Sequence, residues 1–68
     1  MPLSARNHLK GEITDVLLGT VTALVTLKVG DNIVESVITR RSAEELNLKK
    51  GDKVTAVIKA TEVMIQKD

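Results

Sequence analysis

The chain has 68 residues, of which 43% are hydrophobic, while cysteine and the aromatic residues Phe, Trp and Tyr are absent. This length allows one domain, and a domain so small buries only about 60% of the surface that its unfolded chain exposes. The missing cysteines exclude disulfides and thiolate metal sites, and the lone His8 has no carboxylate partners at metal-ligand spacing. Oligomerisation remains as the means of stabilisation, because a single small core rarely supplies more than roughly 3–5 kcal/mol.

The charges are nearly balanced, since ten Lys and Arg face nine Asp and Glu for a formal net charge of +1. No strong overall field therefore draws the protein to nucleic acid or to anionic lipid. The absence of aromatic residues also removes the base-stacking platforms on which most single-strand binders rely. No apolar stretch has the length of a signal peptide core or a membrane span. The composition predicts a cytoplasmic protein without a membrane partner.

Three strands are predicted in the first half of the chain. Residues 9–18 read as a bent strand, in which Gly11 permits a bulge or the close approach of another backbone. Residues 20–29 alternate apolar and polar side chains, which is typical of a strand with one buried face. Gly30-Asp31-Asn32 tolerates positive φ, so residues 33–39 are predicted to return as the second arm of a hairpin.

One short helix and two further strands are predicted to follow. Ser42 and Glu45 have the spacing of a capping box at a helix start. Residues 53–59 alternate again, and residues 63–65 form a last short strand before the charged end. Five strands with a helix between the third and the fourth are the order expected for a small Greek-key barrel of the oligonucleotide/oligosaccharide-binding (OB) kind. We therefore predict an all-β fold with one short helix, a five-stranded OB-like Greek-key barrel that is oligomeric, with residues 1–68 as a single domain.

The opening stretch Ser4-Ala5-Arg6-Asn7 carries a hydroxyl, a guanidinium and a carboxamide within four residues. All three groups donate hydrogen bonds, and the guanidinium adds a permanent positive charge. Such a set is suited to holding an anion. The alternative is that Ser4 and Asn7 only cap turns and that Arg6 lies in solvent, as polar residues near a terminus often do.

Three stretches together resemble a known family. They are the opening motif, residues 37–39 ahead of a Ser-Ala-Glu-Glu-Leu helix, and Val57-Ile58-Lys59-Ala60-Thr61 ahead of Val63-Met64-Ile65. Over essentially the whole chain they resemble the molbindins, small cytoplasmic molybdate-binding proteins made of a single Mop (TOBE-type) domain. The resemblance implies that the protein buffers or stores molybdate for molybdenum cofactor synthesis and binds tungstate as well.

The resemblance also implies which residues form the oxyanion site. They are Ser4, Arg6, Thr39, Ser42, Lys59 and Ala60. The first two come from the opening motif, and the last two supply an ammonium and a backbone N–H from the second motif. Thr39 and Ser42 match positions that contribute hydroxyl or backbone donors in related domains. Family sites lie between the subunits of a hexamer, a trimer of dimers, so the two halves of a site are expected to come from different chains.

This donor set suits molybdate, a tetrahedral dianion that carries no proton at neutral pH and therefore needs donors and no acceptors. Arg6 and Lys59 would balance its two charges, and each charge-assisted hydrogen bond contributes roughly 1.5–3 kcal/mol. Hydrogenphosphate carries a proton that needs an acceptor, and sulfate must be rejected by the size of a rigid cavity. The alternatives are that Lys59 is an exposed strand lysine and that Thr39 reflects strand propensity alone.

No nucleophile–base pair, Gly-rich phosphate loop or metal-ligand cluster is present at recognisable spacing, so we expect no enzyme activity and no catalytic cofactor. Two other functions stay open. An OB-type nucleic-acid-binding module would use the basic doublets Arg40-Arg41 and Lys49-Lys50, which acidic neighbours balance. A purely structural oligomerising domain would be indifferent to oxyanions.

Overall fold

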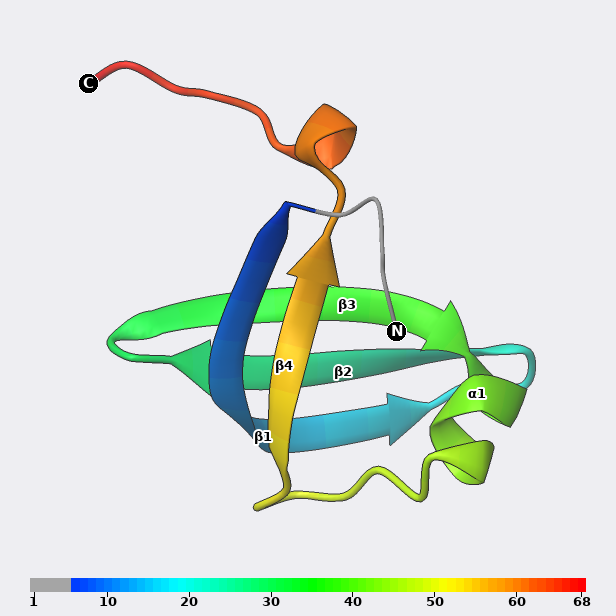
Figure 1. The fold of residues 1–68 in the computed structure, drawn as a ribbon. Helices are drawn as coiled ribbons and strands as arrows, with labels where there is room; N and C mark the ends of the chain where they lie inside the picture. Colours follow the sequence, from blue (N-terminus) through cyan, green and yellow to red (C-terminus); the bar gives the residue numbers. More distant parts are fainter. Residues whose placement is uncertain (1–5) are drawn as a thin grey trace.

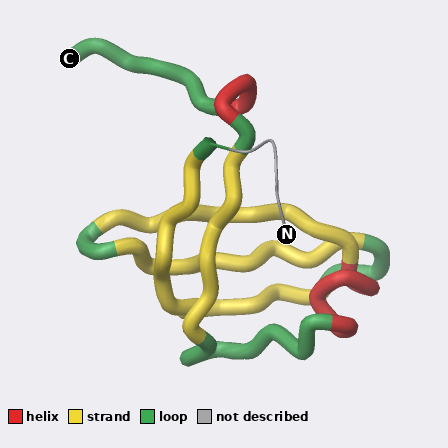
Figure 2. Tube along the Cα trace, in the orientation of Figure 1, coloured by secondary structure: helices red, strands yellow, loops and turns green. Residues whose placement is uncertain are grey.

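The computed structural model describes residues 6–68, which form an all-β fold with one short helix (Figure 1). The elements in chain order are β1 (Asn7–Leu18), β2 (Thr22–Val29), β3 (Asn32–Thr39), α1 (Arg40–Glu45), β4 (Lys53–Ile58) and the 3-10 turn η1 (Ala60–Glu62). The four strands form one antiparallel sheet in the order β3-β2-β1-β4. The sheet is strongly bent, so that β4 and the first part of β1 cross in front of β2 and β3 (Figures 1 and 2).

The first strand belongs to both halves of the bent sheet. Its residues 7–12 pair with β4, and its residues 12–18 pair with β2. The register with β2 shifts between Ile13 and Asp15, which marks a bulge just after the crossover. Gly11 lies at this bend, where an added Cβ would stand only 2.6 Å from the Lys28 carbonyl oxygen. The predicted bent strand is therefore confirmed, and so is the close backbone approach at its glycine.

Replacing Gly11 with alanine is expected to lower the free energy of unfolding by roughly 1–3 kcal/mol, because the added methyl group overpacks the bend. That methyl group would also meet Cγ2 of Val29 at 2.9 Å, so the backbone and a side chain must both move. Thermal unfolding followed by far-UV circular dichroism measures the change. Gly19→Ala is the milder comparison, since the Cβ added at Gly19 would stand 3.0 Å from its nearest neighbour, the Thr22 carbonyl oxygen. Equal stability of the Gly11 variant and the wild type would contradict the expectation.

The core is formed by the inner face of β2 and the strands beside it. Ala23, Val25 and Leu27 are buried, as the alternation of residues 20–29 predicts, and Ile13 pairs with Leu27 from β1. The hairpin is also confirmed, because Val29 pairs with Asn32 across a tight turn in which Gly30 has a φ of 59°. Beneath the sheet an apolar hollow opens between the core residues and the edge strands β3 and β4. Its apolar lining includes Ile13, Val25, Leu27, Ile38, Leu48 and Ile58.

The predicted helix is present, but its predicted cap is wrong. The N-cap is Thr39, whose hydroxyl accepts a hydrogen bond from the Ser42 N–H at 3.0 Å. Ser42 is therefore the third residue of the helix, and no capping box with Glu45 forms. The helix begins earlier because the Arg40 N–H donates to the Val21 carbonyl at 2.8 Å and Glu45 pairs with Arg41 at 3.0 Å.

Residues 6–68 contain four strands where the sequence predicts five, because residues 63–65 form no strand. The turn η1 directs the chain away from the sheet, and the last residues extend beyond it (Figures 1 and 2). Met64 and Ile65 are 93% and 90% exposed, and Val63 is exposed as well. This apolar segment has a sequence that favours a strand, but none of the strands within residues 6–68 pairs with it.

Candidate functional site

The pairing of β1 with β4 brings two predicted site residues to the same end of the sheet. Asn7 pairs with Ile58, so Arg6 and Lys59 are the next residues outward on the two antiparallel strands. The Asn7 side chain donates to the Ile58 carbonyl at 3.3 Å and ties the two strand ends together. Arg6 and Lys59 are both exposed. Ser4, the other donor of the opening motif, lies outside the described residues.

Lys59 and Ala60 lie where β4 passes into the turn η1. Lys59 is extended, with φ −67° and ψ 140°, and it stands at the N-cap position of the turn. The turn closes through a hydrogen bond from the Glu62 N–H to the Lys59 carbonyl at 2.9 Å. Ala60 is the first residue of the turn, where a backbone N–H has no partner within the turn itself. The geometry thus offers an ammonium and a backbone donor from adjacent residues.

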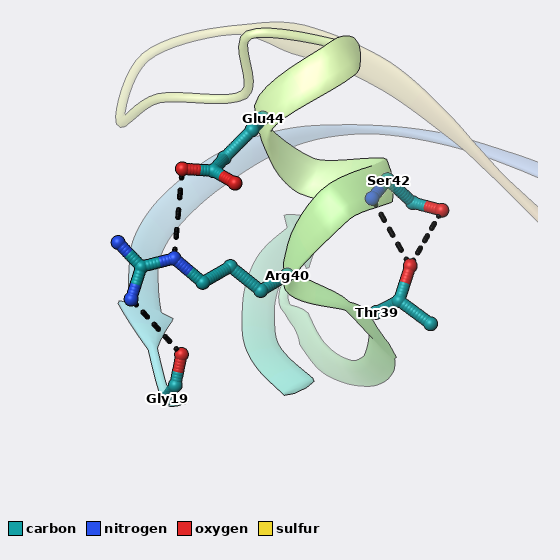
Figure 3. A network of polar contacts seen from close by, with 5 residues as sticks. All are labelled: Gly19, Thr39, Arg40, Ser42 and Glu44. Carbon is teal, nitrogen blue, oxygen red and sulfur yellow. Dashed lines mark hydrogen bonds and ion pairs between the residues drawn. The ribbon is translucent and has the colours of Figure 1, made fainter. Parts of the chain in front are cut away.

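Thr39 and Ser42 form a second group at the start of α1, drawn in Figure 3. The Thr39 hydroxyl accepts from the Ser42 N–H and donates to the Ser42 hydroxyl oxygen at 2.8 Å. The Ser42 hydroxyl hydrogen is left to donate elsewhere, because its oxygen already accepts. The helix packs against β2 and β3, whereas Lys59 follows β4. Within one chain the two groups therefore lie on different parts of the fold (Figure 1).

The cations of the described residues differ in how they are compensated. Arg40 and Arg41 form ion pairs with Glu44 and Glu45, four residues further along α1. Lys49 and Lys53 pair with Asp52 and Glu12. Within residues 6–68, no ion pair is formed by Arg6 or Lys59. Two cations that the strand register holds side by side thus have charge to offer to an anion.

A second cationic surface on β1, β2 and β4 was not predicted from the sequence. This basic hollow is lined by Lys10, Glu12, Lys28, Lys53 and Thr55, with Gly11, Gly30 and Val54. Its residues come from three separate stretches of the chain, and the strand register, which sets Glu12 opposite both Lys28 and Lys53, brings these stretches together. The Lys53 ammonium, through its hydrogen bond and its charge, lowers the pKa of Glu12 below its ordinary value, and Lys28 contributes.

The lowered pKa of Glu12 predicts a pH-dependent contribution to stability. A carboxylate with a depressed pKa in the folded state stabilises the fold above its unfolded pKa, about 4.3, and this contribution disappears as the pH falls through the lower folded value. Glu12→Gln is therefore expected to lower the melting temperature slightly at pH 7 and by less at about pH 3, which lies below the unfolded pKa. Melting curves of both proteins at the two pH values measure this difference. A gap that stays constant with pH would contradict it.

The part of the chain that the structure describes holds no group of three or more His, Asp or Glu side chains placed to bind a metal ion. None of its helices is long and apolar enough to cross a membrane. The remaining candidate ligand for the exposed cations is an anion. Their hydrogen-bonding capacity is that of donors, as an oxyanion requires.

A model of the TOBE domain matches residues 3–65. Because the match covers nearly the whole chain, the protein belongs to the TOBE-domain family. Molybdenum-pterin-binding protein 1 of Clostridium pasteurianum is 48% identical to it over 66 residues, covering 96% of this chain and 97% of that protein. The chain is accordingly a member of the molbindins, the group within the TOBE family that its motifs resemble.

Two solved structures share the fold. A molybdate-binding protein from Sporomusa ovata matches with a TM-score of 0.95 and 37% identity, over 98% of this chain and 100% of that one. The cytoplasmic molybdate-binding protein ModG, with molybdate bound, matches with a TM-score of 0.82 and 41% identity, over 88% of this chain and 43% of that one.

Proposed function

We propose that this protein binds molybdate, and tungstate as well, and serves as a cytoplasmic store of the oxyanion without enzymatic activity. The observation that carries the proposal is the register of β1 and β4, which sets Arg6 beside Lys59 at one end of the sheet. Neither cation has an ion-pair partner within residues 6–68. Relatives that are named for binding molybdate or molybdenum-pterin support the same function.

The chemistry of these groups matches a dianion that carries no proton. The guanidinium of Arg6 and the ammonium of Lys59 supply two positive charges, and the N–H of Ala60 and the hydroxyl of Ser4 supply neutral donors. None of these groups is a carboxylate. Hydrogenphosphate, whose proton needs an acceptor, is therefore disfavoured. Sulfate is smaller than molybdate and loses contacts in a cavity that cannot shrink around it, whereas tungstate has nearly the same size as molybdate.

The site is proposed to lie between copies of the chain. Arg6 and Lys59 lie at one part of the fold, and the hydroxyls of Thr39 and Ser42 lie at another, at the start of α1. An anion that takes donors from both groups therefore needs one group from each of two copies. The resemblance to the molbindins implies the same arrangement, in a hexamer built as a trimer of dimers from chains whose residues 1–68 form a single domain.

The residues 63–65 supply a physical reason for assembly, and we name them the apolar tail. Their side chains are exposed, and β3 and β4 are the edge strands on either side of the apolar hollow. Unpaired edges accept an extended segment readily. The tail of a second copy is the proposed fifth strand, which completes the five-stranded Greek-key barrel and covers Ile38 and Ile58.

The OB-type nucleic-acid-binding function is not favoured. Its support in the sequence is the five-strand pattern together with the doublets Arg40-Arg41 and Lys49-Lys50. Both guanidinium groups are paired with carboxylates of the same helix, and Lys49 is paired with Asp52. The chain also has no aromatic residue on which a base could stack.

Isothermal titration of the purified protein with molybdate tests the proposal, with sulfate and phosphate as competitors and the mass of the assembly measured alongside. Tight binding of molybdate that excess sulfate does not displace is expected, and tungstate should give a similar curve. A well-folded assembly that gives no heat with molybdate or tungstate would overturn the function. An oligonucleotide affinity that falls steeply with salt would support the nucleic-acid alternative instead.

A further inference from the structure

Arg40 makes two contacts that connect the start of α1 to the turn between β1 and β2, and a third contact within the helix. Figure 3 shows the two contacts that its side chain makes. Its backbone N–H donates to the Val21 carbonyl at 2.8 Å, and Nη1 of its guanidinium donates to the Gly19 carbonyl at 3.2 Å. Nε of the same guanidinium pairs with the Glu44 carboxylate at 3.5 Å, one turn further along the helix. One side chain thus bridges the helix and a turn that lies 21 residues earlier in the chain.

The helix has little else to hold it. It has only six residues, and Ala43 is its one buried residue. Helices this short are not stable by themselves and depend on tertiary contacts. The contacts of Arg40 therefore hold the first turn of α1 against the β1–β2 turn, in addition to the pairing of Thr39 with Thr22 at the end of β3. The first turn of α1 begins with Thr39 and includes Ser42, the two hydroxyls of the proposed site.

We infer that Arg40 is a positioning residue of the oxyanion site, an inference that rests on the proposed function. Its guanidinium is engaged by Gly19 and Glu44 and does not touch the anion. It acts through Thr39 and Ser42, because it fixes the helix start on which their donors are carried. The discrimination between molybdate and sulfate depends on this fixed placement, since donors that can move inward will also close around the smaller anion.

The adjacent residue supplies a matched control. Arg41 pairs with Glu45 at the same spacing as Arg40 with Glu44, and the two arginines carry the same charge. The Arg41 side chain is 88% exposed, however, and among the described residues its polar partner is Glu45. Replacing either arginine changes the net charge and the helix composition equally, but only the change at Arg40 removes a side-chain bond to the β1–β2 turn, while the backbone bond from its N–H to the Val21 carbonyl remains.

The test compares Arg40→Gln and Arg41→Gln in molybdate titrations with and without sulfate, well below the unfolding temperature of each variant and with the mass of the assembly checked. Arg40→Gln is expected to weaken molybdate binding about tenfold and to lower the molybdate-to-sulfate affinity ratio. Arg41→Gln is expected to stay within about twofold of the wild type in both quantities. A folded, assembled Arg40→Gln protein with wild-type affinity and ratio would overturn the inference.

Two further variants separate positioning from direct contact and remain informative if Arg40→Gln fails to fold. Glu44→Gln removes one anchor of the guanidinium and should weaken molybdate binding. If Arg40 instead touched the anion, the same change would strengthen binding, because a negative charge near the anion is lost. Arg40→Lys should not restore affinity, since an ammonium lacks the planar fork that reaches Gly19 and Glu44 together.

Failure of the proposed function gives a different result from failure of this inference. A wild-type protein that binds no molybdate overturns both. A wild-type protein that binds molybdate, together with a Glu44→Gln variant that binds it more tightly, leaves the function intact and assigns Arg40 to direct contact. A melting temperature that falls while affinity and selectivity stay unchanged assigns Arg40 a structural role only.

Discussion

Arg6→Ala is expected to weaken molybdate binding by about 10- to 100-fold, because it removes a charged donor from an anion that carries two negative charges. Arg6 is exposed and precedes β1, so its loss should leave the melting temperature and the mass of the assembly nearly unchanged. Calorimetric titration measures the affinity. Arg6→Lys keeps the charge without the bidentate geometry and should fall between the wild type and the alanine variant.

Lys10, a cation of β1 that lies away from Lys59, provides a control for this experiment. Lys10→Ala removes a cation from the same strand, but Lys10 lines the basic hollow and pairs with Thr55, away from the strand ends. The affinity of the Lys10→Ala variant for molybdate should be close to that of the wild type. If Arg6→Ala keeps full affinity while Lys10→Ala loses it, the site lies in the basic hollow and the proposed location is wrong.

Met64→Glu is expected to dissociate the assembly into smaller species and to abolish molybdate binding at a site shared between copies. The Met64 side chain is 93% exposed in a single chain, so a charge there costs nothing unless another copy covers it. Sedimentation velocity measures the mass, and titration of the same samples measures binding. Gln66→Glu adds the same charge two residues later and should preserve both the mass and the affinity. A Met64→Glu protein with wild-type mass would show that the tail takes no part in assembly.

The strands were predicted well wherever one strand face is buried within the chain. The alternation of residues 20–29 correctly predicts that Ala23, Val25 and Leu27 are buried. The strands that pair with β2 and help to bury these residues, β1 and β3, belong to the same chain. Residues 63–65 have an equally apolar sequence, but the structure provides no strand beside them. A sequence pattern shows that a segment favours a sheet and does not show which chain supplies the neighbouring strand.

The helix cap and the role of Arg40 could not be predicted, and the reason is the same for both. Ser42 with Glu45 and Thr39 with Ser42 are competing caps, and tertiary contacts of Arg40 with Val21 and Gly19 select the earlier one. In the sequence, nothing distinguishes Arg40 from Arg41, each of which has a glutamate four residues later. The placement of Arg6 beside Lys59 likewise follows from the pairing of β1 with β4, which only the structure shows.

The turn η1 has a consequence for the size of the assembly. In the proposed assembly, one copy donates its apolar tail and another copy receives it at a strand edge, and these are different surfaces of the chain. The contact between the two copies is therefore heterologous, except where a twofold axis makes each copy both donor and receiver. A reciprocal exchange closes after two copies, and a one-way exchange continues into a ring or an open fibre. The direction in which the tail leaves is set by Ala60–Glu62, closed by the bond between Glu62 and Lys59. In the proposed assembly, the direction that these three residues give the tail would therefore select between a closed particle and an open polymer.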